Sequence, residues 1–170
     1  ADTLRYKRIP CDAIWMDIDY MDGYRIFTFN PQGFPDPKAV NRDLHLRGFH
    51  SVWMIDPGAK AETGYSVYDS GTANDVWVKT VDGKEYNGDA WPGKVAWPDF
   101  TDPKVCQWWG GLYKDFMAQG VDGVWNDVNE PQVSNTPTGT MPEDNLHRGG
   151  NGIPAGTHLQ YHNVYGFLMV

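Results

Sequence analysis

The chain has 170 residues, a net charge of −8 at pH 7 and an aromatic content of 14%. With this excess of acidic residues the sequence gives no indication of a basic surface, so nucleic acids and anionic membrane surfaces are poor candidate partners. No apolar run approaches the roughly 20 residues that span a bilayer, so we expect no membrane-spanning segment. Composition indicates neither an oligomeric state nor a cellular compartment.

Three short apolar segments each lead into an acidic residue. The segments and the acids that follow them are 13–16 with Asp17, 51–55 with Asp56, and 123–125 with Asp127. Short, continuously apolar segments are typical of strands in a parallel sheet that is covered on both faces. Because sites in such sheets form at the carboxyl ends of the strands, we interpret the three acids as candidate site residues.

Helix signals lie between these segments. One helix is expected from Asp36 to Gly48, with a proline in its first turn. A second is expected from near Asp102 to Gly120, although a glycine pair inside it costs roughly 1 kcal/mol per residue relative to alanine. The alternation of strand and helix predicts an α/β fold with a parallel sheet.

Two connections exceed the usual length of about 2–6 residues for such folds. The first, about 57–100, predicts an inserted loop subdomain, within which 76–81 reads as one arm of a hairpin and 85–86 as a weaker return strand. The second, about 131–157, is rich in Pro, Gly, Asn and Thr and predicts a long exposed loop. A last helix is expected to begin near His158.

Asp127 is the candidate catalytic carboxylate. An isolated aspartate at the end of a strand more often caps a following helix, because Asp and Asn dominate turns and caps. Because the same pattern of an apolar segment followed by an acid occurs three times, we interpret Asp127 as a site residue and not as a helix cap. Tryptophans in breaker-rich loops, Trp91 and Trp97, suit sugar recognition because flat rings pack against the C–H face of a pyranose. The alternative is that they are ordinary loop anchors.

Metal and cofactor chemistry finds little support in the sequence. His158 and His162 have the spacing of two zinc ligands on a helix, but Leu159 stands where a metalloprotease needs glutamate, so packing or surface histidines are expected. The acidic run 17–22 lacks the glycine and final glutamate of a calcium loop. We therefore predict no metal and no cofactor.

The stretch WNDVNEP (125–131) resembles the nucleophile signature of the α-glucosidases of glycoside hydrolase family 31. The stretches 15–37, MIDPG (54–58) and WPG (91–93) resemble other motifs of these enzymes in the same order, with a weaker match in YHNVYG (161–166). The resemblance implies that 1–170 is a fragment of a single catalytic domain, a partial (β/α)₈ barrel. The insertion at about 57–100 and the long loop at about 131–157 would belong to that domain.

The resemblance also implies roles for individual residues. Asp127 corresponds to the nucleophile that forms a covalent glycosyl-enzyme intermediate, and Glu130 is expected to support it. Asp17 corresponds to the carboxylate that binds sugar hydroxyls. The remaining expected substrate-binding residues are Met54, Asp56, Trp91 and Trp125.

The predicted function is that of a retaining α-glucosidase, which hydrolyses terminal α-linked glucosyl residues of oligosaccharides or other α-glucosides. A retaining mechanism needs a second carboxyl as acid/base, and the resemblance places it after Val170, so we expect the fragment alone to be inactive. Alternatives are an α-glucosyl transferase or α-glucan lyase of the same family, a non-catalytic carbohydrate-binding fragment, and a barrel enzyme that binds metal.

Overall fold

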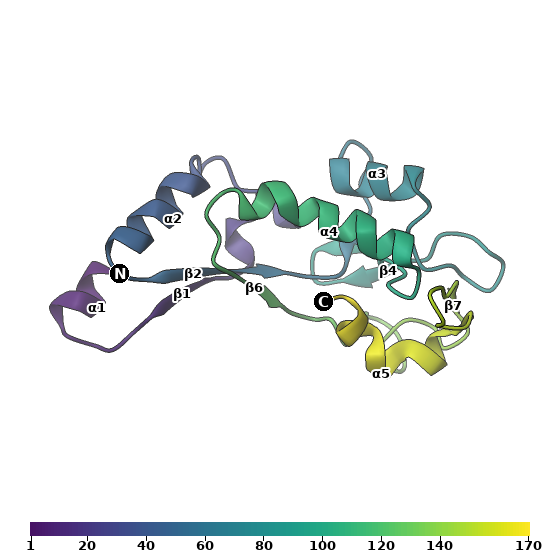
Figure 1. The fold of residues 1–170 in the computed structure, drawn as a ribbon. Coiled ribbons are helices and arrows are strands. Elements are labelled where there is room, and N and C mark those ends of the chain that lie inside the picture. The colour runs from purple at the N-terminus through teal and green to yellow at the C-terminus, as the bar shows by residue number, and fades with distance from the viewer. The chain divides into compact units, whose positions relative to one another are not determined.

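The computed structural model describes all residues 1–170 and divides into two compact units. Unit 1 comprises Ala1–Ile55 and Leu112–Asn126, and unit 2 comprises Asp56–Gly111 and Asp127–Val170. Unit 1 contains α1 (Asp2–Tyr6), β1 (Ala13–Met16), η1 (Ile18–Tyr20), η2 (Asp22–Tyr24), α2 (Pro37–Leu46), β2 (His50–Ile55) and β6 (Gly123–Asn126) (Figure 1). Unit 2 contains β3 (Ala59–Lys60), α3 (Ser66–Ala73), β4 (Asn87–Ala90), β5 (Gly93–Ala96), β7 (Leu146–His147), β8 (Gly156–Thr157) and α5 (His158–Leu168). Helix α4 (Pro103–Met117) begins in unit 2 and ends in unit 1.

The core of unit 1 is a parallel sheet with the order β1-β2-β6. Met16 is in register with Trp53, and Ile55 with Asn126, so the carboxyl ends of the strands lie at one edge. The three predicted strands are confirmed, with β2 beginning one residue earlier and β6 ending one residue later than expected.

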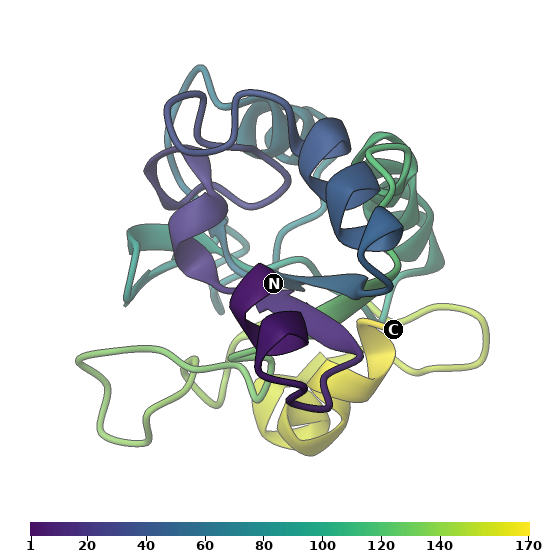
Figure 2. The ribbon, with the colours of Figure 1, turned by 90° about the vertical axis from the view of Figure 1, so that its left-hand side faces the viewer.

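Helices cover one face of this sheet. Figure 2, which looks along the strands, shows α2 on one side of them. Trp53, on that face, is fully buried, and its indole N–H donates to the side chain of Asn41 on α2 over 3.0 Å. Because strand residues alternate between faces, Trp15 and Trp125 lie on the opposite face. Their rings meet edge to face at 6.0 Å, and Trp15 is 59% exposed, so this face is incompletely covered.

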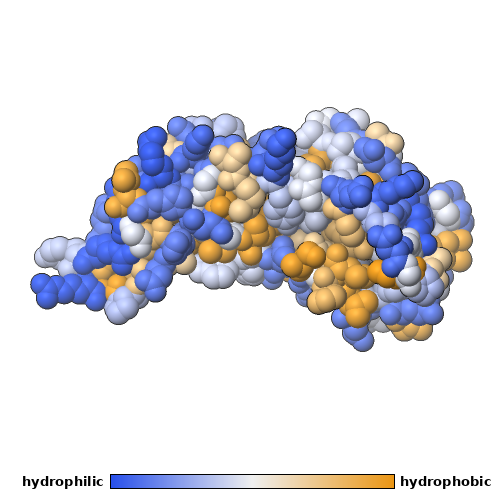
Figure 3. Space-filling view, viewed as in Figure 1, coloured by the Kyte–Doolittle hydropathy of each residue, from blue (hydrophilic) through white to orange (hydrophobic).

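Helix α2 begins and ends as its sequence predicts. The Asp36 carboxylate accepts the backbone N–H of Ala39 over 2.8 Å, which caps the first turn, and Gly48 follows the helix with a φ of +73°. The outward surface over α2 is mostly hydrophilic with isolated hydrophobic residues (Figure 3).

Helix α4 forms despite its glycine pair. A Cβ atom added at Gly110 or Gly111 would meet nothing within 4 Å, so both glycines face open space. The opposite side carries Val105, Trp109 and Phe116, which are at most 3% exposed. Burial of these large apolar side chains offsets the unfavourable glycine propensity.

Asp122, in the turn before β6, joins that strand to β2 and α2. Its carboxylate accepts the Ser51 backbone N–H over 2.8 Å and contacts His45 Nε2 over 2.6 Å. Burial favours a higher pKa for Asp122, but the bonds from Ser51 and His45 and the charges of His45 and His50 outweigh it, so the pKa of Asp122 is lowered.

This lowered pKa predicts a loss of stability in acid. A carboxyl with a depressed folded-state pKa contributes stability above its unfolded value of about 3.9, and the contribution disappears as the pH falls through the folded-state pKa. We expect Asp122→Asn to flatten the decline in thermal midpoint below about pH 4. Asp115→Asn, at an exposed position of α4, is the control. A decline of unchanged steepness in Asp122→Asn would contradict this assignment.

The hairpin of unit 2 differs from the expected one. Segment 76–81 does pair with its return, since Thr80 N–H donates to the Lys84 carbonyl and Tyr86 N–H to that of Val78, but only as an isolated bridge. The regular hairpin is β4–β5, which the sequence analysis missed. Its residues NGDAWPGKVA have weak strand propensity, so tertiary packing decides their conformation.

Helix α3 was also missed, because it is short, has no capping side chain and contains Gly71. A Cβ atom at Gly71 would lie 2.1 Å from Cζ2 of Trp77, which is fully buried. The glycine that weakens the helix signal is therefore the residue that admits the indole ring.

The prediction that 131–157 is an exposed loop was wrong for part of the segment. Val133, Thr140, Met141, Asn145 and His147 are at most 8% exposed. The segment has little regular structure beyond β7 and β8, but its side chains fill the interior of unit 2. Its Pro, Gly and Asn content reflects turns, and turns do not require exposure.

None of the helices combines the length and the apolar character needed to cross a membrane.

Candidate active site

The predicted acids lie at the carboxyl ends of the three parallel strands. Asp17 follows β1, Asp56 follows β2 and Asp127 follows β6, each as the next residue in the chain. Neighbouring strands are roughly 4.8 Å apart, so the ends of β1 and β6, which flank β2, are separated by about 10 Å.

Asp127 has an unengaged carboxylate. The side chain is half-buried, yet it accepts no hydrogen bond and forms no ion pair in the chain. No helix follows it, so it is not a cap, in contrast to Asp36 on α2. A carboxylate in this state is available to a ligand.

The residue after Asp127 has an unusual backbone conformation. Val128 has a φ of +43°, a region that β-branched residues rarely adopt and that costs about 1–3 kcal/mol. The Val128 carbonyl accepts the backbone N–H of Gln132 over 3.2 Å, which closes a tight turn directly after Asp127. Such strain is frequent at functional sites.

Asp17 is exposed and partly engaged. Its Oδ1 atom accepts the backbone N–H of Ile18 over 2.8 Å and so caps η1. Its other oxygen accepts no hydrogen bond within the chain and is available to a further donor, since an ionised carboxylate offers about four acceptor positions.

Asp56 and Trp91 form a pair within unit 2. The Trp91 indole N–H donates to Oδ2 of Asp56 over 2.8 Å. Asp56 is 3% exposed and Trp91 38% exposed, so the buried acid fixes the orientation of a partly exposed ring. Both line a small pocket with Trp97 and Val128. Trp97 is 1% exposed and stacks on Tyr86, which makes it a packing anchor.

The remaining predicted residues lie at the ends of β2 and β6. Met54 is buried, and its carbonyl accepts the Tyr20 hydroxyl over 2.6 Å. Trp125 is half-buried and contacts Trp15. Glu130 is exposed and makes no hydrogen bond to the loop that begins at Asp127, so its supporting role stays a prediction.

Sequence reasoning missed several residues around these positions. Trp15, Tyr20 and Val128 contact or directly follow predicted site residues, yet none was singled out for a role. For Trp15 the period-2 alternation of β1 could have indicated the shared face with Trp125. No sequence signal predicts a positive φ at valine.

Potential metal ligands are not arranged around a common point. No group of three or more His, Cys, Asp and Glu side chains is arranged to hold a metal ion.

A parallel sheet built from βα units, with an acidic residue after each strand, is the arrangement of α/β enzymes that carry their sites at the carboxyl ends of the strands. The family model for the glycosyl hydrolases family 31 TIM-barrel domain matches residues 1–170. The chain belongs to glycoside hydrolase family 31.

Curated relatives agree with this assignment. The chain is 44% identical over 169 residues to alpha-glucosidase 2 of Bacillus thermoamyloliquefaciens, covering 99% of this chain and 21% of that protein. It is 40% identical over 164 residues to neutral alpha-glucosidase AB of Sus scrofa, covering 95% of this chain and 17% of that protein. The chain therefore spans about a fifth of the length of these relatives.

Solved structures share the fold. A family 31 alpha-glucosidase from Bacteroides thetaiotaomicron is 70% identical with a TM-score of 0.81, over 99% of this chain and 26% of that one. A glucosidase II alpha subunit, in its DNJ-bound form, is 37% identical with a TM-score of 0.88, over 98% of this chain and 18% of that one. The predicted partial barrel and the predicted family are thus confirmed.

Proposed function

We propose that this chain supplies the nucleophile and part of the sugar-binding subsite of a retaining α-glucosidase. The observation that carries the proposal is the unengaged, half-buried carboxylate of Asp127 at the end of a parallel strand. The names of the relatives support an α-glucosidase.

The proposed reaction has two steps. Asp127 attacks the anomeric carbon of a terminal α-linked glucosyl unit, and the bond to the leaving oxygen breaks as a second carboxyl donates it a proton. Water then attacks the glycosyl ester, gives a proton to that second group and releases Asp127. We place the second carboxyl after Val170, so residues 1–170 alone would not turn over substrate.

The other predicted residues have binding roles in this proposal. Asp17 accepts hydrogen bonds from sugar hydroxyls through its second oxygen. Trp91, Trp125 and Met54 form apolar walls of the subsite, and Asp56 acts by holding the Trp91 ring. Glu130 supports the nucleophile loop.

Covalent labelling tests the proposal. We expect a mechanism-based cyclitol epoxide to label the complete enzyme once, on Asp127, because the epoxide opens by attack of the catalytic carboxylate. Peptide mass spectrometry locates the adduct, and competition by an α-glucoside tests whether labelling occurs at the active site. Label on any other carboxylate would reject Asp127.

Outcomes of the same experiment separate the alternatives. Absence of label together with retained sugar binding would indicate a carbohydrate-binding module, and metal-dependent turnover without label would indicate a metal enzyme. If Asp127 is labelled, product analysis distinguishes the hydrolase, which releases glucose, from a transferase or a lyase. We expect glucose.

A further inference from the structure

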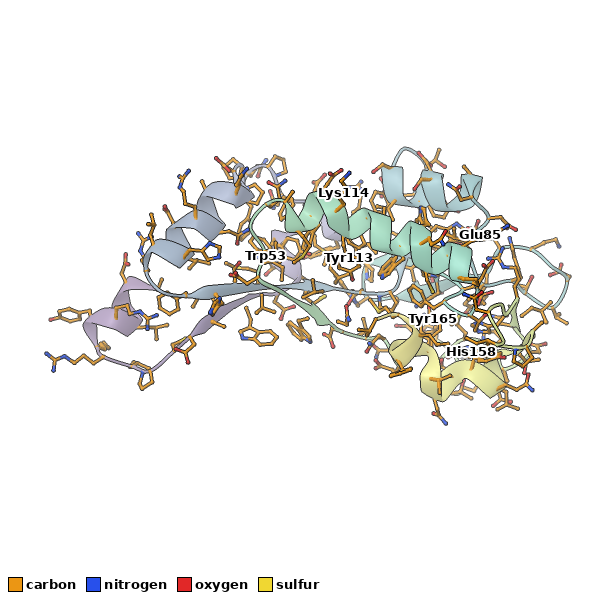
Figure 4. The ribbon with its side chains drawn as sticks, in the orientation of Figure 1. Trp53, Glu85, Tyr113, Lys114, His158 and Tyr165 are labelled. Carbon is orange, nitrogen blue, oxygen red and sulfur yellow. The ribbon has the colours of Figure 1, made fainter.

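Buried polar side chains of unit 2 form a continuous series of contacts that ends at the loop following Asp127. The contacts are Asp99 Oδ1 to His147 Nδ1 (2.9 Å), His147 Nε2 to His158 Nδ1 (3.2 Å), His158 Nε2 to Thr140 Oγ1 (3.1 Å) and Thr140 Oγ1 to the Pro131 carbonyl oxygen (2.9 Å). We refer to this series as the Asp99–Pro131 relay. His158 enters it from the first turn of α5 (Figure 4).

The relay holds one end of the loop that carries Asp127. Thr140 fixes the loop at Pro131, four residues after Asp127. Helix α5 fixes it nearer the middle, since a Cβ atom at Gly166 would lie 2.7 Å from the Asn129 carbonyl oxygen. The backbone of α5 therefore packs directly on the loop, and the strained Val128 lies between Asp127 and these two attachments.

The direction of the last hydrogen bond in the relay is fixed by its acceptor. A carbonyl oxygen only accepts, so Thr140 gives its single hydroxyl hydrogen to Pro131. The Thr140 oxygen can in turn accept an N–H from an imidazole ring, and both His158 Nε2 (3.1 Å) and His162 Nδ1 (3.2 Å) lie within hydrogen-bond distance of it. His162 Nδ1 also lies 3.3 Å from His158 Nε2.

The far end of the relay is a buried carboxylate. His147 Nδ1 faces Asp99 Oδ1, and both side chains are at most 1% exposed. Burial raises the pKa of Asp99, but the hydrogen bond and charge of His147 and the bonds from Arg148 and Thr101 lower it more, so Asp99 is ionised. Burial lowers the pKa of His158 to about 3, which keeps that ring neutral.

Other ionisable groups surround this pair from each packed element. Arg148 binds Asp99 through its backbone N–H (2.7 Å) and Nε (3.4 Å), and its side chain also contacts Asp75 and Asp102. The ionisable groups that α5 brings to the two imidazole rings are Tyr161, His162 and Tyr165. Burial and the charge of Asp99 raise the pKa of Tyr165, so it stays neutral.

We propose that Thr140 is a positioning residue for the nucleophile loop: its hydroxyl holds the loop at the Pro131 carbonyl, and the buried side chains of the relay hold Thr140 in turn. This inference rests on the proposed function of Asp127.

Three variants of the complete enzyme test the positioning role. Thr140→Val removes the hydroxyl at nearly constant shape, Thr140→Ser restores it, and Thr138→Val is the control at an exposed position of the same loop. We expect Thr140→Val to lower kcat/KM and the rate of epoxide labelling at Asp127 about tenfold, with KM changed less than about twofold, because binding contacts remain. Thr140→Ser and Thr138→Val should stay near wild type.

The results separate this inference from the proposed function. Wild-type labelling at Asp127 with an unchanged labelling rate in Thr140→Val would overturn the inference and leave the function intact. Labelling of the wild type elsewhere would overturn both. If Thr140→Val does not fold, Thr140→Ala takes its place, with Thr140→Ser as the rescue.

Discussion

Asp127→Asn in the complete enzyme is expected to abolish turnover of an α-glucoside, with a loss of at least about a thousandfold in kcat. The amide has the size of the carboxylate but cannot act as a nucleophile toward the anomeric carbon. The fold should be unaffected, because the Asp127 carboxylate makes no hydrogen bond or ion pair whose loss would destabilise the chain. Initial rates and the thermal midpoint measure the two effects.

A second variant and a control sharpen this result. Asp127→Gly leaves space at the nucleophile position, so azide should restore turnover of an activated α-glucoside and yield the glycosyl azide of inverted configuration. Asp115→Asn, exposed on α4, should behave as wild type. Residual activity of Asp127→Asn above about a tenth of wild type would remove this residue from the nucleophile role.

Trp53→Ala should produce the largest loss of stability in unit 1, about 3–5 kcal/mol in the free energy of unfolding. The ring is fully buried and meets Tyr20, Phe29 and Phe34 at centroid distances of 4.8, 5.4 and 5.5 Å. Its loss leaves a cavity under the helices and removes the donor to Asn41. Urea unfolding followed by circular dichroism measures the change.

Two further variants divide this effect into its parts. Trp53→Phe keeps a ring but leaves the Asn41 oxygen without its indole donor, which should cost about 1–3 kcal/mol. Leu46→Ala, at a position 78% exposed on α2, should change stability by about 0.5 kcal/mol or less. A Trp53→Ala effect no larger than that of Leu46→Ala would show that the sheet does not depend on this ring.

Local patterns were sufficient for the elements that frame the candidate site. The apolar segments 13–16, 51–55 and 123–125 predicted three parallel strands, and the aspartate and proline at the start of α2 predicted its cap, because these signals come from neighbours in the chain. Where the local signal was weak, it failed. Gly71 weakens the helix pattern of α3, so that helix was not predicted. The turn-rich composition of 131–157 gave no indication that several of its side chains are buried.

The chain's order of residues was enough to predict the family, the parallel sheet and the position of Asp127 after its third strand, since strand periodicity and motif order are local properties. Three features became visible only in the folded structure. The carboxylate of Asp127 has no partner, and the ring of Trp15 contacts that of Trp125. The hydrogen-bonded side chains of Asp99, His147, His158 and Thr140 connect segments up to 59 residues apart. Such contacts depend on packing in three dimensions, so the spacing of residues along the chain does not predict them.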